Sequence, residues 1–276
     1  MRPLFVGPLT VESLQIPIPG LPQRLQGKVI VQLSDFHYDG QRLSHKLLAD
    51  AVSTILTLNP DLVVFTGDYI THEPEPVYEL ATHLSPIAKA FPTYAILGNH
   101  DNYWPDAHQV VTAALTDISI TVLWNQIAYP FGHDLALVGL ADYYHPDFTP
   151  QILDQLSNTL PRIVLSHNPD TAEVMIPWRI DLQLSGHTHG GQIILPVIGN
   201  VAQRWFQFRQ RLPKIIRKSG IPFISDRCAN LVRHWEWALG LHKVGPKNLL
   251  YVNRGLGSYA PGRLFCNPEI TVITLT

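Results

Sequence analysis

The chain is poor in cysteine and has no long apolar run. Only Cys228 and Cys266 occur among its 276 residues, which excludes the disulfide framework typical of small secreted domains. A reducing compartment fits best, although one bridge between the two cysteines stays open. No stretch approaches the ~18 consecutive apolar residues of a membrane-spanning helix. The N-terminus, MRPLFVGPLTVESLQIPIPG, has no apolar signal-peptide core and no twin arginine. We therefore expect a cytoplasmic protein, which still permits peripheral contact with a membrane.

Charged residues are also scarce. They make up 15% of the chain, against 46% hydrophobic residues, a balance that allows a large buried core and argues against disorder. The net charge of −2 indicates neither a nucleic-acid partner nor a membrane partner by itself. The chain also lacks internal repeats and low-complexity segments. What it does contain is a series of short apolar runs, each followed by polar residues.

These runs of Val, Ile and Leu predict strands that are buried on both faces. Amphipathic segments between them predict helices, so strands and helices alternate as in an α/β protein. The expected helices cover residues 44–59, 105–117, with Pro105 in the first turn, and 149–160. The terminal segments 11–18 and 269–276 alternate apolar and polar residues, which favours antiparallel or edge strands.

Polar side chains of three chemical types follow five of the predicted strands. They are Asp35 and His37, Asp68, Asn99 and His100, His167, and His187 and His189. Each alone has a structural explanation, such as a helix cap, a turn or a left-handed backbone position. Together they indicate a site, because ligands of α/β sheets bind beyond the carboxyl ends of the strands.

The mixture of side chains also has a chemical logic. Two divalent ions about 3.5–4 Å apart need a bridging carboxylate and a set of ligands each. Three carboxylate or amide oxygens and four imidazoles are sufficient for this. Such a set favours Mn, Fe or Zn over Ca or Mg, which prefer oxygen ligands only.

The motifs SDFH, GD, GNHD, SH and GHTH, in this order, resemble those of the calcineurin-like metallophosphoesterases. GHTHGGQIILP and the later YVNRGLGSYAPGRLF are similar to the branch of YkuE- and YaeI-type phosphodiesterases. That branch is similar to an enzyme that cleaves UDP-2,3-diacylglucosamine in lipid A synthesis. The resemblance implies a four-layer α/β sandwich, in which helices flank two mixed β-sheets.

The resemblance also implies roles for individual residues. It assigns Asp35, His37 and His189 to one metal ion, and Asn99, His167 and His187 to the other, with Asp68 as the bridge. His100 would stabilise charge on the phosphoryl group or protonate the leaving oxygen, and Asp101 or another carboxylate would orient its ring. Arg254 and Arg263 would hold phosphate, or else form surface salt bridges. Asp142, at another strand end, is a weaker candidate for a residue behind the ligands.

One segment departs from the average composition. Residues 201–247 contain ten Lys and Arg but two Asp and Glu, a charge of +8, and three of the six tryptophans. Within a single domain over 1–276, this segment predicts a basic, aromatic, helical insertion. Trp205, Phe208 and Leu212 would share one helix face, and Leu231, Trp235 and Leu239 another. An anionic membrane surface suits such faces. The alternatives are lid helices packed on the sandwich and, least favoured, a nucleic-acid surface.

The sequence therefore predicts a phosphoesterase with two divalent metal ions, Mn before Fe or Zn. Its expected substrate is a phosphodiester or pyrophosphate, including a lipid-linked UDP-sugar. A phosphodiesterase or nuclease acting on soluble nucleotides is the first alternative. A binding scaffold without turnover is the second, but such a scaffold would be expected to lack metal ligands, and all seven are present here.

Overall fold

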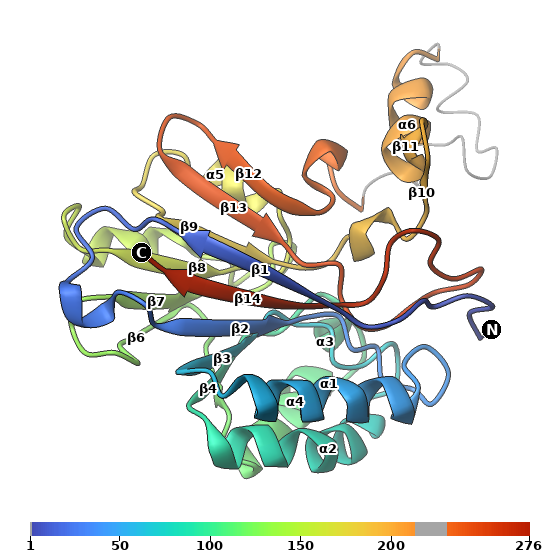
Figure 1. The fold of residues 1–276 in the computed structure, drawn as a ribbon, viewed down its shortest axis with the longest axis horizontal. Coiled ribbons are helices and arrows are strands. Elements are labelled where there is room, and N and C mark those ends of the chain that lie inside the picture. The colour runs from blue at the N-terminus through green and yellow to red at the C-terminus, as the bar shows by residue number, and fades with distance from the viewer. Residues whose placement is uncertain (1, 213–230) are drawn as a thin grey trace.

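The computed structural model describes residues 2–212 and 231–276 and contains two six-stranded sheets that face each other (Figure 1). The first sheet has the order β1-β14-β2-β3-β4-β5. Its strands are β1 (Thr10–Ile16), β14 (Glu269–Leu275), β2 (Val29–Leu33), β3 (Leu62–Phe65), β4 (Thr93–Ala95) and β5 (Thr121–Val122). Strands β2 to β5 are parallel, whereas β14 runs antiparallel to β2.

The second sheet has the order β12-β13-β9-β8-β7-β6 and is also mixed. Its strands are β12 (Gly240–Val244), β13 (Asn248–Val252), β9 (Leu182–Ser185), β8 (Arg162–Leu165), β7 (Ala136–Gly139) and β6 (Gln126–Ala128). The four central strands are parallel, and the two edge strands are antiparallel to their neighbours. A small hairpin of β10 (Ile194–Leu195) and β11 (Gly199–Asn200) stands apart from both sheets.

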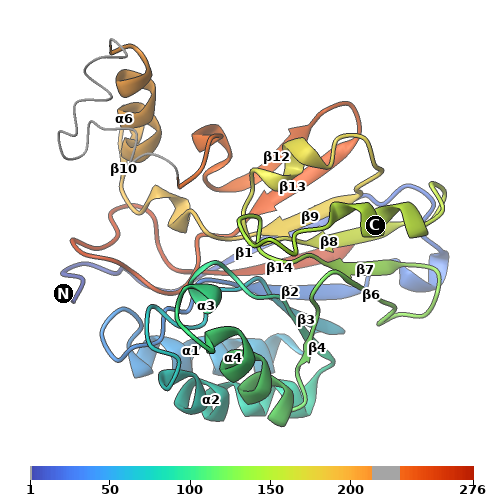
Figure 2. The same cartoon turned by 180° about the vertical axis from the view of Figure 1, so that it is seen from behind.

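Apolar side chains fill the space between the sheets and the outer face of the first sheet. Ile30 and Val64 of the first sheet share one core with Ile163 and Leu184 of the second. Helices α1 (His45–Leu58), α2 (Pro76–Ala90) and α4 (Ala107–Asp117) pack on the outer face of the first sheet (Figure 2). Strands such as β3 are therefore covered on both sides, which explains their uninterrupted apolar sequence.

The outer face of the second sheet carries a thinner layer. It consists of the 3-10 helix η2 (Pro150–Gln155) and the short α5 (Thr171–Val174). The remaining short helices are η1 (Gln23–Leu25), α3 (His100–Tyr103), η3 (His189–Gly191), α6 (Val201–Gln210) and η5 (Trp235–Trp237). The predicted α/β sandwich of two mixed sheets and helices is confirmed.

The predicted bounds of individual helices and strands are confirmed in some places and wrong in others. The first helix begins as expected, because the Ser44 hydroxyl accepts a hydrogen bond from the Leu47 N–H. The predicted helix over 149–160 is only the single 3-10 segment η2. Pro105 precedes α4 rather than starting it, since Asp106 takes a left-handed conformation. The terminal strands match the prediction, since β1 is an edge strand and β14, which lies inside its sheet, runs antiparallel to β2.

The basic segment is helical only in part. The described residues form α6, η5 and strand β12, so the predicted second helix around Trp235 is wrong. The reason lies in Asp170, whose carboxylate accepts the backbone N–H groups of Arg233 and His234 and holds the chain in a non-helical path. Four basic residues, Lys214, Arg217, Lys218 and Arg227, lie outside the described residues, as does Cys228. Cys266 is buried. Among the described helices, none is long and apolar enough to cross a membrane.

Candidate metal centre

The predicted ligands follow the carboxyl ends of parallel strands from both sheets. β2 leads to Asp35 and His37, and β3 leads to Asp68. β4 leads to Asn99, β8 to His167, and β9 to His187 and His189. All seven side chains are buried, with exposures between 0% and 7%. The site therefore lies where the strand ends of the two sheets meet.

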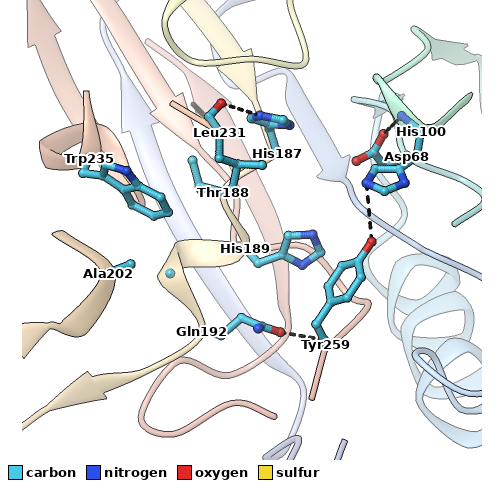
Figure 3. A pocket seen from close by; sticks show the side chains of 11 residues that line it. Asp68, His100, His187, Thr188, His189, Gln192, Ala202, Leu231, Trp235 and Tyr259 are labelled. Atoms are coloured by element: carbon cyan, nitrogen blue, oxygen red, sulfur yellow. Dashed lines mark hydrogen bonds between the residues drawn. The ribbon is translucent and has the colours of Figure 1, made fainter. Parts of the chain in front are cut away.

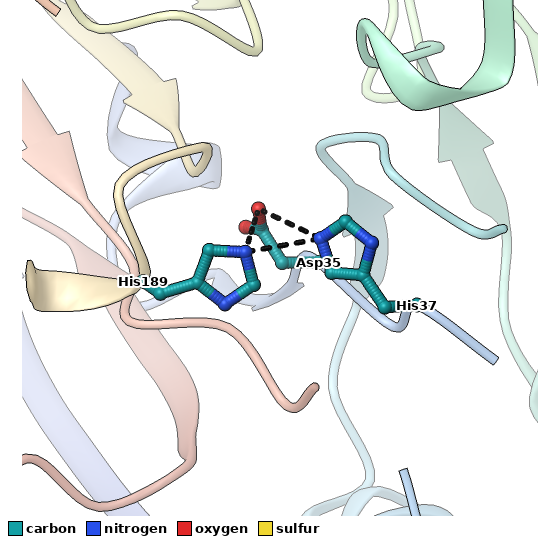
Figure 4. Close-up of side chains that lie close together, drawn as sticks. All are labelled: Asp35, His37 and His189. Atoms are coloured by element: carbon teal, nitrogen blue, oxygen red, sulfur yellow. Dashed lines mark hydrogen bonds and ion pairs between the residues drawn. The ribbon is translucent and has the colours of Figure 1, made fainter. Parts of the chain in front are cut away.

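Asp35, His37 and His189 form the first cluster (Figure 4). The Nε2 atoms of the two imidazoles lie 3.0 Å apart. Oδ1 of Asp35 lies 3.4 Å from Nε2 of His189 and 4.0 Å from Nε2 of His37. Ligands at right angles around a metal ion with bonds of about 2.1 Å would be about 3 Å apart, so these three atoms have a spacing suited to a shared cation.

Asp68, His167 and His187 form the second cluster. Nε2 of His167 lies 3.1 Å from Oδ2 of Asp68 and 3.2 Å from Nδ1 of His187. The same Oδ2 atom lies 3.5 Å from Nε2 of His37 in the first cluster. Asp68 thus stands between the two groups of ligands.

The protons on the imidazoles can be placed from their other contacts. Nδ1 of His167 lies 2.7 Å from the Thr66 carbonyl, and Nε2 of His187 lies 2.9 Å from the Leu231 carbonyl. A carbonyl only accepts hydrogen bonds, so these nitrogens carry the protons. The opposite nitrogens face each other across 3.2 Å. Two neutral rings in this arrangement repel unless a proton or a metal ion lies between their lone pairs, so the arrangement fits a metal site.

Asn99 and His189 add to this fit. Oδ1 of Asn99 is buried and has no hydrogen-bond partner among the described residues. Because an unpaired buried acceptor is costly, a metal ion is a fitting partner for this oxygen. Nδ1 of His189 donates to the Gly257 carbonyl at 3.2 Å and leaves its Nε2 free to coordinate.

Burial and charge set the protonation of these groups. Burial lowers the pKa of His37 and His189 to about 3 and that of His187 to about 4. These three imidazoles are therefore neutral, as metal ligands must be. Burial also lowers the pKa of His167, but the adjacent Asp68 carboxylate outweighs it and raises the value to about 10. A metal ion bound beside Asp68 competes with that proton.

The backbone around the ligands is strained. Five of the seven ligand residues have a positive φ: Asp35, His37, Asp68, His187 and His189. Such conformations cost of order 1–3 kcal/mol each and gather at functional sites. Gly186 lets the chain approach closely, because a Cβ at this position would lie 2.2 Å from Oδ2 of Asp35. Gly98 is equally restricted, since its Cβ would lie 2.2 Å from Oδ1 of Asp68.

Asp101 does not orient the His100 ring, which corrects the prediction. The two residues are neighbours on α3, where successive side chains point about 100° apart. The Asp101 carboxylate instead accepts backbone N–H groups of Asp68, Tyr69 and Gly98 at 2.8–2.9 Å. Burial and the nearby Asp68 charge raise the pKa of Asp101 to about 7. The ring of His100 is held by the Thr71 carbonyl, which accepts from Nδ1 at 2.7 Å.

The two predicted phosphate-binding arginines are already paired. Arg254 forms ion pairs with Glu12 at 2.6 Å and Glu269 at 2.7 Å. Arg263 is 3% exposed, and its guanidinium donates to Ser258 Oγ and to main-chain carbonyls, including that of Gly257. Neither guanidinium is free to hold a substrate phosphate. Their role in this structure is to fix the loop that follows β13.

A pocket opens beside the clusters, and its lining includes Tyr259, which was not among the predicted site residues (Figure 3). Tyr259 places its hydroxyl 3.2 Å from Nδ1 of His37 and 3.4 Å from Nε2 of His100. It lies within the stretch YVNRGLGSYAPGRLF, which carried the family resemblance but offers no periodic signal that would single out this tyrosine. On the opposite side the pocket is lined by Ala202, Leu231 and Trp235.

A third group of three donors lies outside this site. His45, Glu79 and His83 converge on the surface of α1 and α2. The Tyr38 hydroxyl lies 3.2 Å from Nδ1 of His45, which gives that ring a partner within the chain. These histidines thus keep the surface role expected from the sequence.

An α/β sandwich with carboxylate, amide and imidazole ligands at its strand ends is the structure of a metal-dependent phosphoester hydrolase. A family model described as "Calcineurin-like phosphoesterase" matches residues 28–191, and the chain belongs to that family. The family implies divalent metal ions, and the clusters above are the residues suited to hold them.

Relatives confirm the predicted branch. The chain is 33% identical to "Phosphodiesterase YaeI" of Escherichia coli (strain K12), over 89% of this chain and 81% of that protein. It is 32% identical to the metallophosphoesterase YkuE of Bacillus subtilis (strain 168), over 98% and 87% respectively. It is 29% identical to "UDP-2,3-diacylglucosamine pyrophosphatase LpxG" of Chlamydia muridarum (strain MoPn / Nigg), over 96% and 88%.

Proposed function

We propose that the protein is a binuclear phosphoesterase that hydrolyses a phosphodiester or pyrophosphate bond next to a lipid-bearing group. The position of Asp68 carries the binuclear part of the proposal. Its Oδ2 atom lies 3.1 Å from His167 and 3.5 Å from His37, one imidazole from each cluster. Asp35, His37 and His189 would hold one ion, and Asn99, His167 and His187 the other. The mixed nitrogen and oxygen set favours Mn, with Fe or Zn next.

The bound ions would supply a hydroxide nucleophile at neutral pH and neutralise charge on the phosphoryl oxygens. The chain itself contributes His100, which lines the pocket. Since Nδ1 of His100 donates to the Thr71 carbonyl, its Nε2 atom is the one available to the pocket. At that atom His100 would hold the proton that the leaving oxygen takes up.

The apolar side of the pocket supports a substrate with a lipid part. The pocket wall opposite Asp68 and His100 is lined by Ala202, Leu231 and Trp235 (Figure 3). An acyl chain would bury this wall, whereas a nucleotide base would cover only the area on which it stacks. Together with the pyrophosphatase named among the relatives, it favours a lipid-linked UDP-sugar such as UDP-2,3-diacylglucosamine.

An anionic membrane is the proposed location of that substrate. On α6 the side chains of Trp205 and Phe208 are 43% and 51% exposed, although Arg209 on the same helix is buried. The N-terminus and the β10–β11 hairpin lie at the same end of the molecule as α6 in both views (Figures 1 and 2), and these segments contain the exposed Phe5 and Val197. Trp205 and Phe208 lie within residues 201–247, whose charge is +8, and this combination suits peripheral binding to anionic lipid.

Two measurements test the catalytic part of the proposal. Anomalous scattering from crystals soaked in Mn²⁺ should give two peaks within about 4 Å of each other. Mn-loaded protein should hydrolyse UDP-2,3-diacylglucosamine with a higher kcat/KM than bis(p-nitrophenyl) phosphate, and Asp68→Asn should abolish both activities while the fold survives. A single peak would overturn the binuclear assignment. Activity confined to soluble nucleotides would overturn the lipid substrate.

Vesicle sedimentation tests the membrane part. The protein should bind anionic vesicles at low salt, and Trp205→Ala with Phe208→Ala should weaken the binding that persists at high salt. The control is Leu56→Ala with Tyr78→Ala, which removes two exposed apolar side chains from α1 and α2. Equal loss in both double variants, or no binding by the wild type, would contradict the proposed surface.

A further inference from the structure

The partner of His37 differs in kind from the partners of the other ligand imidazoles. His167, His187 and His189 each direct one ring nitrogen at a main-chain carbonyl. His37 instead directs Nδ1 at a side chain, the hydroxyl of Tyr259, at 3.2 Å. A hydroxyl differs from a carbonyl because it can accept one hydrogen bond and donate another.

The direction of each hydrogen bond follows from the neighbours. Nε2 of His37 faces Nε2 of His189 at 3.0 Å, on the side where a metal ion would be held. With Nε2 coordinating, the proton of His37 is on Nδ1, and Tyr259 accepts it. The hydroxyl proton of Tyr259 is then free to point at Nε2 of His100, 3.4 Å away. Neutral His100 accepts it at Nε2, because Nδ1 of that ring donates to the Thr71 carbonyl. When Nε2 instead holds the proton for the leaving oxygen, the direction reverses, and the Tyr259 oxygen accepts from both imidazoles.

The phenol ring of Tyr259 is fixed by its packing. It meets the ring of His37 edge-on at 5.0 Å between centroids and that of His189 at 5.4 Å. The Arg42 guanidinium lies 4.7 Å from the centre of the phenol ring. The backbone N–H of Tyr259 donates to Oε1 of Gln192 at 2.7 Å. A side chain held on several sides can hold its neighbours in turn.

We propose that Tyr259 is a positioning residue that connects the Asp35, His37 and His189 cluster to His100. Its hydroxyl fixes the ring orientation of His37 toward the metal side, and it aims Nε2 of His100 into the pocket. The inference rests on the proposed binuclear function. It adds a residue to which the sequence motifs assigned no role, and it connects metal binding with the orientation of the proton-holding imidazole.

The test is Tyr259→Phe, which keeps the ring and its packing and removes only the hydroxyl. Apoprotein is titrated with Mn²⁺, and the two binding steps are followed by calorimetry and by electron paramagnetic resonance. Loss of a partner behind a ligand imidazole weakens metal binding about 10- to 100-fold. One of the two Mn²⁺ sites should weaken by this factor, and the other should change less than about twofold.

Steady-state kinetics at saturating Mn²⁺ on a phosphodiester with a poor leaving group test the connection to His100, because the departure of nitrophenolate from bis(p-nitrophenyl) phosphate needs little protonation. The kcat should fall about tenfold and KM should stay within about twofold, because His100 is misaligned while substrate binding is kept. The matched control is Tyr251→Phe, which removes a buried tyrosine hydroxyl that bonds to Glu269 away from the site. Its metal affinities and kcat should equal those of the wild type.

The outcomes distinguish the effect of Tyr259 on metal binding through His37 from its effect on His100. If Tyr259→Phe retains both metal affinities and kcat, Tyr259 has no positioning role. If both sites weaken equally, the effect does not pass through His37, and the inference is wrong. If one site weakens but kcat at saturating Mn²⁺ is unchanged, the connection to His100 is refuted. If the wild type binds one Mn²⁺ per chain, the binuclear function itself fails, whatever the variant does.

Discussion

Replacing Asp101 by asparagine should damage the metal site although Asp101 is no ligand. Its Oδ2 atom accepts the N–H groups of Asp68 and Gly98, each at 2.8 Å. Its Oδ1 atom accepts those of Tyr69 at 2.9 Å and Ile70 at 3.3 Å. This one carboxylate thus holds the chain segments that carry Asp68 and α3 in register.

The size of the effect follows from the number of donors. The side-chain amide of asparagine has one acceptor, its oxygen, and its other terminal atom carries an NH₂ donor. In either orientation the NH₂ group therefore faces two backbone N–H groups and leaves both without an acceptor. Each buried donor left unsatisfied costs about 1–3 kcal/mol. Asp101→Asn should therefore lower the free energy of unfolding by about 2–6 kcal/mol, a large share of the 5–15 kcal/mol typical of a domain.

Urea unfolding of the metal-free protein measures this free energy, and elemental analysis measures metal content after reconstitution. Asp117→Asn is the control, because it makes the same change at an exposed position at the end of α4. A loss below about 1 kcal/mol with normal metal content would refute the reasoning. If instead only esters with poor leaving groups were slowed, Asp101 would act on His100 after all.

Three further changes have defined outcomes. His100→Asn should slow esters with poor leaving groups far more than nitrophenyl esters and leave the metal content unchanged, which leaving-group kinetics and elemental analysis can check. Gly186→Ala should lower metal content, because its Cβ would lie 1.9 Å from the nearest side-chain oxygen, whereas Gly20→Ala, with nothing within 4 Å, should not. Burial raises the pKa of Asp61, but the Lys28 ammonium outweighs this and holds it below its usual value. The resulting stability is present at neutral pH and is lost as pH falls from about 4 through the folded-state pKa. Asp61→Asn should therefore flatten the acid side of the unfolding curve by less than about 1 kcal/mol.

The strand ends could be predicted because burial selects apolar residues in the strands and metal chemistry selects carboxylate, amide and imidazole residues after them. A strand covered on both faces, such as β3, is apolar throughout, so the polar residues that follow it are easily recognised. The mixture of carboxylate, amide and imidazole then limits the chemistry to metals. The left-handed backbone conformation at positions such as Asp68 and His187 cannot be recognised from residue type in this way. It follows from strain imposed by the surrounding loops rather than from local propensity.

The roles of single polar residues were harder to predict, because a role depends on what each side chain contacts. A sequence does not distinguish a buried guanidinium such as that of Arg263, which donates to main-chain carbonyls, from one that awaits a phosphate. Adjacency is equally misleading for Asp101, since helix geometry turns it away from His100. The path of Arg233 and His234 depends on the distant Asp170, which a helical periodicity cannot reveal.

The loop after β13 shows why the site needs more of the chain than the matched residues 28–191. Each ligand of the first cluster depends on it. The backbone N–H of Gly257 donates to the main-chain carbonyl of Asp35 at 2.7 Å, and the Gly257 carbonyl accepts from His189. The Tyr259 hydroxyl contacts His37. Arg263 holds this loop by donating to the Gly257 carbonyl at 2.6 Å. Arg263 was predicted to hold phosphate or to form a surface salt bridge, but in the structure it supports the loop that contacts the predicted ligands. The proposed metal site therefore depends both on the strand ends and on this later loop.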